Sequence, residues 1–196
     1  TVATAVELDL FTKLKQRGPM TREEIARELG LDEKPCRILL LGCTSLRLLK
    51  KRGSRYRATA TARFEMTSDN PRSIIPIIML EKYIIYRPMF HYLAAAKKNT
   101  NLGLAEYKGD EDTLYARLAH HPELEEIFQD AVEAISAQSN EHLTRHVNFG
   151  RFQRVVDVGG GNGANAIAMV RQFPGLKATV FDLPSVCKIA DEHIAA

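Results

Sequence analysis

The first part of the chain, residues 1–65, carries apolar side chains at helical spacing. Residues 3–15 are predicted to form one amphipathic helix whose apolar positions are Val6, Leu8, Phe11 and Leu14. A second helix is expected over residues 21–30, because Thr21 and Glu24 are spaced as a capping box, in which each side chain accepts the other residue's backbone N–H. A glycine follows each of these segments and suits the end of a helix.

A strongly apolar stretch comes next and predicts the third helix of the same domain. Pro35 suits the first turn of this helix, which is expected to continue to Leu49. Gly53-Ser54, flanked by Tyr56 and Thr59, then marks a small β-hairpin. Three helices followed by a hairpin are typical of a winged-helix domain.

The middle of the chain, residues 66–150, has a sequence that indicates helices throughout. Residues 74–96 form a long apolar stretch in which two prolines are expected to kink the backbone, and a polar loop is predicted to follow as far as residue 110. After a short helix, Pro122 starts a longer one that runs to Val147 with apolar residues along one face. We expect this region to be a helical linker.

The last part, residues 151–196, changes to short apolar strands. Strands are predicted over residues 154–158 and 177–181, with a helix over residues 164–173 between them and another after them. Such a β-α-β unit makes the two strands parallel, with a right-handed crossover. The predicted fold class is α/β: a winged-helix domain and a helical linker precede the first β-α-β unit of a Rossmann-like sheet.

Composition narrows the class of protein. The 196 residues are 45% hydrophobic and 26% charged, which is ordinary for a soluble globular chain. The longest uncharged apolar stretch, residues 73–80, is far shorter than the ~20 residues that a membrane span needs. The acidic residues among positions 1–11 exclude a signal peptide there, and three cysteines without a CxxC pair suggest reduced thiols in the cytoplasm. We therefore expect neither a membrane nor a nucleic-acid partner.

The strongest chemical signal is the glycine turn at residues 159–163. Its glycines let a ligand approach the backbone, and they fit the dinucleotide pattern G-x-G-x-x-[GA], which is weak evidence alone. Asp157 precedes the turn at the mouth of the first strand, where a carboxylate suits a cationic ligand and repels a pyrophosphate. Asp182 follows the second strand and is placed to accept hydrogen bonds from the ribose hydroxyls of an adenosine group. Leu183 would pack against the adenine of the same group. Together these features favour S-adenosylmethionine over NAD.

The sequence from Val155 to Gly163, followed by Phe181-Asp182-Leu183-Pro184, resembles the first two cofactor motifs of class I S-adenosylmethionine-dependent O-methyltransferases. It is similar in particular to the group with an N-terminal winged-helix dimerisation domain, found in plant phenolic and bacterial natural-product pathways. The resemblance implies a homodimer, a small aromatic hydroxyl substrate, no metal, and S-adenosylhomocysteine as product. It also implies that the cofactor binds Asp157, Gly159, Gly161, Gly163, Asp182, Leu183 and, at its methionine carboxylate, Ser136. Ser139 competes with Ser136 for this last role.

The chain departs from this family at its C-terminal end. The family's sheet has more strands than the two predicted here, and its catalytic histidine and part of its substrate pocket come later in the sequence. The expected base therefore lies beyond Ala196, and we expect the 196 residues to be a fragment or to need a complementary chain. Two strands and one helix cannot cover both faces of a parallel sheet.

Two alternative functions remain open at this stage. Seven cations without an acidic residue lie between positions 47 and 63, and on a winged helix they would suit a DNA-binding regulator with a ligand-sensing lobe. Residues 36–49 are nearly all apolar, however, so a dimer interface with a cationic rim is favoured for that helix. An NAD-dependent oxidoreductase is the other alternative, which Asp157 disfavours. Candidates for an acceptor pocket are Met79, Tyr83, Tyr86, Met89, Phe90, His91, Phe128 and Val132.

Overall fold

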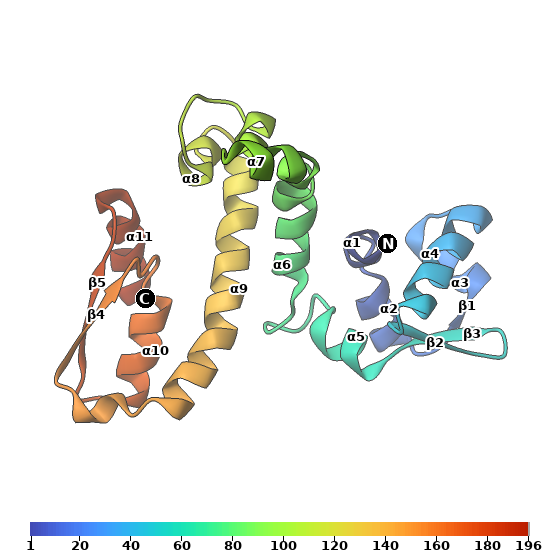
Figure 1. Cartoon of the computed structure of the whole chain (residues 1–196). Coiled ribbons are helices and arrows are strands. Elements are labelled where there is room, and N and C mark those ends of the chain that lie inside the picture. Colours follow the sequence, from blue (N-terminus) through green and yellow to red (C-terminus); the bar gives the residue numbers. More distant parts are fainter. Residues whose placement is uncertain (196) are drawn as a thin grey trace. The chain divides into compact units, whose positions relative to one another are not determined.

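The computed structural model describes residues 1–195 and divides into two compact units, Thr1–Ala131 and Val132–Ala196 (Figure 1). The first unit contains the winged-helix part and the short helices that follow it. The second contains the end of a long helix and the β-α-β unit. Among the described residues, no helix has both the length and the apolar character needed to cross a membrane.

The N-terminal helix predicted over residues 3–15 is wrong as a single element. The structure has α1 (Val2–Glu7) and α2 (Leu10–Arg17), separated by Asp9 in the left-handed conformation with φ of 54°. Aspartate is one of the few residues other than glycine that adopt this conformation at modest cost. The break lets both helices direct side chains into one core, where Ala5, Leu10 and Phe11 are almost fully buried.

The second predicted helix is confirmed as α3 (Arg22–Leu29), with its capping box. The Thr21 hydroxyl accepts the Glu24 N–H at 3.2 Å, and the Glu24 carboxylate accepts the Thr21 N–H at 2.7 Å. Gly30 ends the helix in the left-handed conformation with φ of 63°. Sequence reasoning did not find β1 (Met20–Thr21), which immediately precedes α3.

The third helix, α4 (Glu33–Ser45), is shorter than predicted. It ends at Ser45 rather than Leu49, because Arg47 turns the chain with φ of 60° and Leu49 already belongs to a strand. One face of α4 is buried by Cys36, Leu39, Leu40 and Cys43. The opposite face exposes more than half of the Ile38 and Leu41 side chains, and Leu46 directly after the helix is also more than half exposed, so this apolar helix is not buried all round within the protomer.

The predicted hairpin is confirmed as β2 (Leu49–Arg52) and β3 (Arg55–Ala58). With β1 it forms an antiparallel sheet in the order β1-β3-β2, the wing of the winged-helix domain. Leu49 pairs with Ala58, and both side chains enter the core. A short helix that the sequence analysis missed, α5 (Ala60–Glu65), follows and is capped by the Thr59 hydroxyl.

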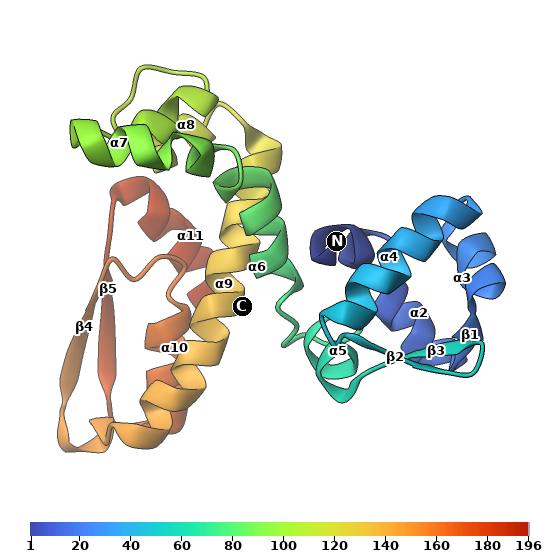
Figure 2. The ribbon, with the colours of Figure 1, turned by 45° about the vertical axis from the view of Figure 1, so that its right-hand side comes forward.

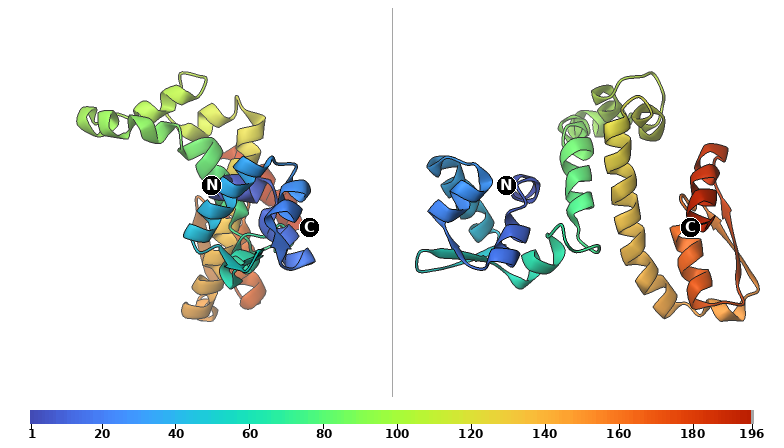
Figure 3. Two further views of the ribbon diagram at one scale, coloured as in Figure 1. Left: turned by 90° about the vertical axis from the view of Figure 1, so that its right-hand side faces the viewer. Right: turned by 180° about the vertical axis from the view of Figure 1, so that it is seen from behind.

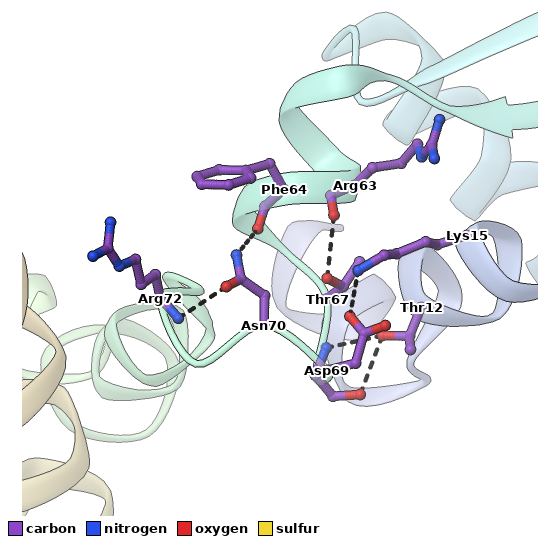
Figure 4. Close-up of polar contacts among 9 residues, drawn as sticks. Thr12, Lys15, Arg63, Phe64, Thr67, Asp69, Asn70 and Arg72 are labelled. Atoms are coloured by element: carbon purple, nitrogen blue, oxygen red, sulfur yellow. Dashed lines mark hydrogen bonds and ion pairs between the residues drawn. The ribbon is translucent and has the colours of Figure 1, made fainter.

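The segment after α5 is bound to α2 by a cluster of polar contacts (Figure 4). The Thr12 hydroxyl, which is buried, accepts the Ser68 N–H at 2.9 Å, and Lys15 forms an ion pair with Asp69 at 2.7 Å. Thr67 is also buried and donates its hydroxyl to the carbonyl of Arg63 at 3.2 Å. The chain therefore leaves the winged-helix part along a fixed path.

Short helical pieces make up the rest of the first unit: α6 (Ile75–Leu80), the π-helix η1 (Glu81–Ile85), the 3-10 helix η2 (Pro88–His91), α7 (Tyr92–Lys98), the 3-10 helix η3 (Leu102–Glu106) and α8 (Leu114–Leu118). Pro76 and Pro88 lie at the starts of helices and do not kink one. Proline has no backbone N–H, and in the first turn of a helix that group would have no intrahelical partner. The predicted polar loop is partly wrong, because it includes η3 and the buried Leu104 and Tyr107.

The second unit confirms the predicted β-α-β unit. After α9 (Pro122–His146) and the 3-10 helix η4 (Phe149–Arg151), the chain forms β4 (Arg154–Val158), α10 (Ala164–Gln172), β5 (Lys177–Phe181) and α11 (Pro184–Ala195). The two strands are parallel, with Arg154 opposite Lys177 and Val158 opposite Phe181 (Figure 2). One face of this sheet leaves Val156, Val158 and Phe181 mostly exposed.

Candidate cofactor site

The glycine turn connects β4 to α10 and has the backbone that its sequence requires. Gly159, Gly161 and Gly163 have φ of 72°, 56° and 82°, in the left-handed region where a side chain is strained. The N–H of Gly159 donates to the carbonyl of Phe181 at 2.8 Å, and that of Gly163 to the carbonyl of Gly160 at 2.9 Å. The glycine turn is therefore held at the end of β5, and α10 begins directly after it.

Asp182 lies against this turn, as expected for residues that follow neighbouring parallel strands. Its Oδ2 atom accepts the Gly161 N–H at 2.9 Å, and its Oδ1 atom accepts the N–H of Leu183 at 2.7 Å. Each carboxylate oxygen can accept more than one hydrogen bond, so Asp182 retains acceptor capacity for ligand hydroxyls. Leu183 follows with an exposed side chain.

Asp157 lies in β4 on the half-buried side of the sheet, opposite Val180. Its Oδ2 atom is buried and has no hydrogen-bond partner among the described residues. Burial raises the pKa of Asp157, a hydrogen bond from the Asn165 side chain opposes this rise, and the nearby Asp182 carboxylate adds to it. An unpartnered buried acceptor of this kind costs about 1–3 kcal/mol, which a donor on a bound ligand would offset.

Ser136 lies on α9 in the second unit, and the C-terminal end of α9 lies near that of α10 (Figure 3). The side-chain amide of Gln172 donates to the carbonyl of Thr144 at 3.1 Å, which aligns the two helices. Both helices run in the same direction (Figure 1). Ser136 precedes Thr144 by eight residues and Ala164 precedes Gln172 by eight residues, so each lies about 12 Å along its own helix from that hydrogen bond. Ser136 is half-buried, and Ser139 is exposed. Within the described chain, neither hydroxyl makes a hydrogen bond to the turn.

Two positions at this site, and one buried polar residue elsewhere in the second unit, were missed by sequence reasoning. Gly160 is buried in the turn, and the side chain of Asn165, in the first turn of α10, donates a hydrogen bond to Asp157. Asn140 is buried on α9, and its Oδ1 atom has no partner among the residues described. Gly160 stands at a variable position of the glycine pattern, and the two asparagines carry no motif, so only the packing of α9, α10 and β4 reveals them.

The candidate acceptor residues do not all lie together: Val132 belongs to the second unit, and Met79 and Phe128 pack against two different apolar clusters of buried residues. Tyr86, Met89 and Phe90 line a groove of about 410 Å³ together with Glu81 and Ile85. Tyr83 instead donates its phenol hydroxyl to the Glu7 carboxylate, and His91 contacts Glu106 at 2.7 Å.

The histidine pair on α9 does not form a metal centre in the described structure. His142 and His146 stack on each other, and Nδ1 of His146 hydrogen-bonds the carbonyl of His142 at 2.8 Å. Across the described residues, no group of three histidine, cysteine or acidic side chains converges on a point that could hold a metal ion.

The residues at the turn fit an adenosyl sulfonium cofactor better than a dinucleotide. Asp182 offers acceptors to ribose hydroxyls, and the unpartnered Asp157 oxygen suits a donor that carries positive charge. Two acidic side chains beside one glycine turn would oppose the negative charge of a pyrophosphate. The geometry therefore agrees with the cofactor class indicated by the sequence.

Comparison with known proteins supports the same class. The model of the O-methyltransferase domain matches residues 90–196, and that of the O-methyltransferase dimerisation domain matches residues 1–68. A 3-hydroxy-5-methyl-1-naphthoate 3-O-methyltransferase of Streptomyces sahachiroi is 33% identical, over 100% of this chain and 55% of its own length. An L-tyrosine C(3)-methyltransferase of Streptomyces lavendulae is 28% identical, over 97% of this chain and 52% of its own.

Solved structures agree with these sequence matches. The S-adenosylmethionine-dependent methyltransferase SibL, in its apo form, has a TM-score of 0.84 and 35% identity over 99% of this chain and 57% of its own. Human N-acetylserotonin methyltransferase in complex with SAM has a TM-score of 0.83 and 26% identity over 98% of this chain and 57% of its own. The chain spans about half the length of the relatives it matches. In its order of domains, its fold and its motifs, the chain belongs to the O-methyltransferase family.

Proposed function

We propose that this chain binds S-adenosylmethionine at the glycine turn and belongs to an enzyme that transfers a methyl group to a hydroxyl of a small aromatic acceptor. The observation that carries the proposal is the pair of carboxylates at the turn, one anchored to its backbone and one with a free buried oxygen. The named relatives support the acceptor class, since their titles include a naphthoate and an acetylserotonin O-methyltransferase.

In this proposal each residue at the turn has a distinct role in binding. Asp182 and Leu183 hold the adenosine, with the carboxylate on the ribose hydroxyls and the leucine against the base. Asp157 attracts the cationic end of the cofactor, and Gly159, Gly161 and Gly163 let the backbone approach it. Ser136, half-buried on α9, binds the methionine carboxylate.

The bound cofactor supplies an activated methyl group, and the protein contributes by placing the acceptor oxygen in line with it. Holding two reactants in this way lowers a barrier by up to ~7–11 kcal/mol. A general base then removes the proton of the acceptor hydroxyl. We assign no residue of the described chain to this base.

We further propose that the protein is a homodimer assembled through the winged-helix domain, residues 1–65, and the linker helices, residues 66–150. The exposed apolar face of α4 and the match to a dimerisation domain support this assembly. Residues 151–196 then begin the cofactor domain. A cytoplasmic location is supported by the free thiols of Cys36, Cys43 and Cys187. No nucleic-acid partner is proposed, because the exposed Ile38 and Leu41 of α4 offer no hydrogen-bonding groups to base edges.

Transfer of a labelled methyl group tests the activity directly. The whole enzyme to which this chain belongs is incubated with methyl-labelled S-adenosylmethionine and a panel of phenols, matched anilines and matched aromatic ethers, because the chain alone is expected to be inactive. The proposal expects label in a phenol-derived ether that is absent when the acceptor hydroxyl is already methylated. Label on the ring carbon or on nitrogen would contradict O-methylation while leaving cofactor binding intact.

A further inference from the structure

Gly160 differs from the other glycines of the turn in why it lacks a side chain. It does not have the left-handed φ that Gly159, Gly161 and Gly163 share. A Cβ atom at residue 160 would instead lie 3.0 Å from both Cγ and Oδ2 of Asp157, and 3.0 Å from a methyl carbon of Val180. Such distances are tighter than ordinary Cβ contacts, so a side chain at residue 160 would force Asp157 or Val180 to shift by a few tenths of an ångström.

The Asp157 side chain occupies that space. Its Oδ2 atom is buried under the turn without a hydrogen-bond partner in the described structure, while Asn165 acts on the same carboxylate from α10. A carboxylate in this state is unfavourable for the free protein, because a charged acceptor has lost its water without gaining a full set of donors. Buried polar groups of this kind are retained where a ligand or a mechanism uses them.

We propose that Gly160 is a positioning residue that keeps the Asp157 carboxylate beneath the turn. There Oδ2 accepts a hydrogen bond from the ammonium group of the cofactor. This inference rests on the proposed function and adds a position outside the glycine pattern to it. A side chain at residue 160 displaces the carboxylate and removes the acceptor from the ligand. Gly160 acts through Asp157 and does not itself recognise the cofactor.

A double-mutant cycle on the full chain tests this dependence. Gly160→Ala is expected to weaken binding of S-adenosylhomocysteine about tenfold and to lower the midpoint of urea unfolding. In an Asp157→Ala background the carboxylate is gone, so Gly160→Ala should then leave the affinity almost unchanged, although the close contact with Val180 still lowers the unfolding midpoint. Val180→Ala removes the other close contact and should not restore binding to Gly160→Ala.

Gly175→Ala is the matched control. A Cβ atom at residue 175 meets no atom within 4 Å, and its φ lies outside the left-handed region, so neither affinity nor stability should change. Additive losses of affinity in the cycle, or rescue by Val180→Ala, would overturn the proposal and show that residue 160 acts by packing alone. If the parent chain binds no S-adenosylhomocysteine, both the proposal and the function on which it rests are contradicted.

The pH profile of binding gives a readout that a packing role would not change. Asp157 must be charged to attract a cation, so affinity should fall as the pH drops through its pKa, which burial raises. The groups that act on it are the Asp182 carboxylate and the Asn165 amide. Gly160→Ala should remove most of this pH dependence, because the displaced carboxylate no longer contacts the cofactor. Asn165→Ala should move the midpoint of the fall in affinity to higher pH, and identical pH profiles in all three proteins would refute the coupling.

Discussion

At the scale of single residues, Asp182 has a structural role besides its proposed binding role. The sequence motif predicts a carboxylate for ribose hydroxyls, but in the structure both oxygens accept backbone N–H groups, from Gly161 and Leu183. This arrangement pre-orders the turn for a ligand. The same residue therefore links the end of β5 to the conformation of the turn after β4.

Replacing Asp182 should separate these roles. Asp182→Ala is expected to weaken binding of S-adenosylmethionine at least about tenfold, since hydrogen bonds to a charged group contribute about 1.5–3 kcal/mol. Asp182→Asn keeps one oxygen acceptor and should lose less. Far-UV circular dichroism should show an unchanged fold in both, and an unchanged dissociation constant for Asp182→Ala would refute its role.

Asp9 allows a second prediction at this scale. Its φ of 54° separates α1 from α2, and an alanine there would have to adopt the same left-handed conformation. Asp9→Ala should lower the free energy of unfolding by about 1 kcal/mol, whereas Asp9→Gly should be close to neutral. Urea unfolding measures both, and equal stability of the alanine and glycine variants would show that the break is not under backbone strain.

Residue-level prediction succeeded where the signal is local. The capping box of Thr21 and Glu24 depends on four consecutive residues, and the structure reproduces it. Gly160 and Asn140 could not be identified, because their environment is created by side chains from other elements. A sequence pattern carries no information on which buried atom lacks a partner.

At the scale of elements, the π-helix η1 is the feature that sequence periodicity could not foresee. It follows α6 and is bound to α1, since the Glu7 carboxylate accepts hydrogen bonds from both Lys82 and Tyr83. Lys82 also lies 4.5 Å from the centre of the Tyr83 ring. These contacts fix the start of the segment that presents Tyr86, Met89 and Phe90 to the groove.

The contacts of Glu7 predict a pH-dependent contribution to stability. Hydrogen bonds from Lys82 and Tyr83 hold the pKa of Glu7 below its ordinary value, so its contribution is present above the unfolded-state pKa and is lost as the pH falls through the folded-state pKa. Glu7→Gln should lower the melting temperature by about 1–3 °C at pH 7. This difference should shrink below about pH 4, where the parent's carboxylate is protonated as well.

Salt should reduce the same difference at pH 7, because the pair is partly exposed to solvent. A melting-temperature difference between Glu7→Gln and the parent that is independent of both pH and salt would contradict the assignment.

The elements themselves were predicted with uneven success. Elements that are long, or whose ends are marked by characteristic residues, were predicted from their caps, prolines and glycines. Examples are α3, α9 and the β-α-β unit. The two-residue strand β1 and the short helix α5 depend on pairing with β3 and on packing, which periodicity does not report. The prolines at residues 76 and 88 were placed correctly as interruptions but have a different role, as helix starts.

At the scale of the whole molecule, exposed apolar side chains indicate surfaces that the protomer does not cover. Ile38 and Leu41 on α4 and Leu46 directly after it are 57%, 66% and 53% exposed in the first unit. Contiguous apolar patches of this kind on a soluble protein usually mark interaction sites. The family's dimerisation domain, which matches residues 1–68, includes this face.

A charge on α4 should therefore change the oligomeric state. Leu41→Glu places a carboxylate on the exposed apolar face and is expected to convert a dimer into a monomer without unfolding the protomer. Sedimentation velocity measures the change, and Arg171→Glu, on the exposed side of α10 in the other unit, is the control that should leave the dimer intact. A Leu41→Glu protein that remains dimeric would place the interface elsewhere.

The identity of the ligand at the glycine turn is the claim on which the rest depends, and isothermal titration calorimetry addresses it most directly. The full chain is titrated in parallel with S-adenosylhomocysteine and with NAD at the same pH and ionic strength. We expect saturable binding of S-adenosylhomocysteine that is weakened in Asp182→Ala, and no measurable heat with NAD. Saturable binding of NAD with no response to S-adenosylhomocysteine would contradict the account.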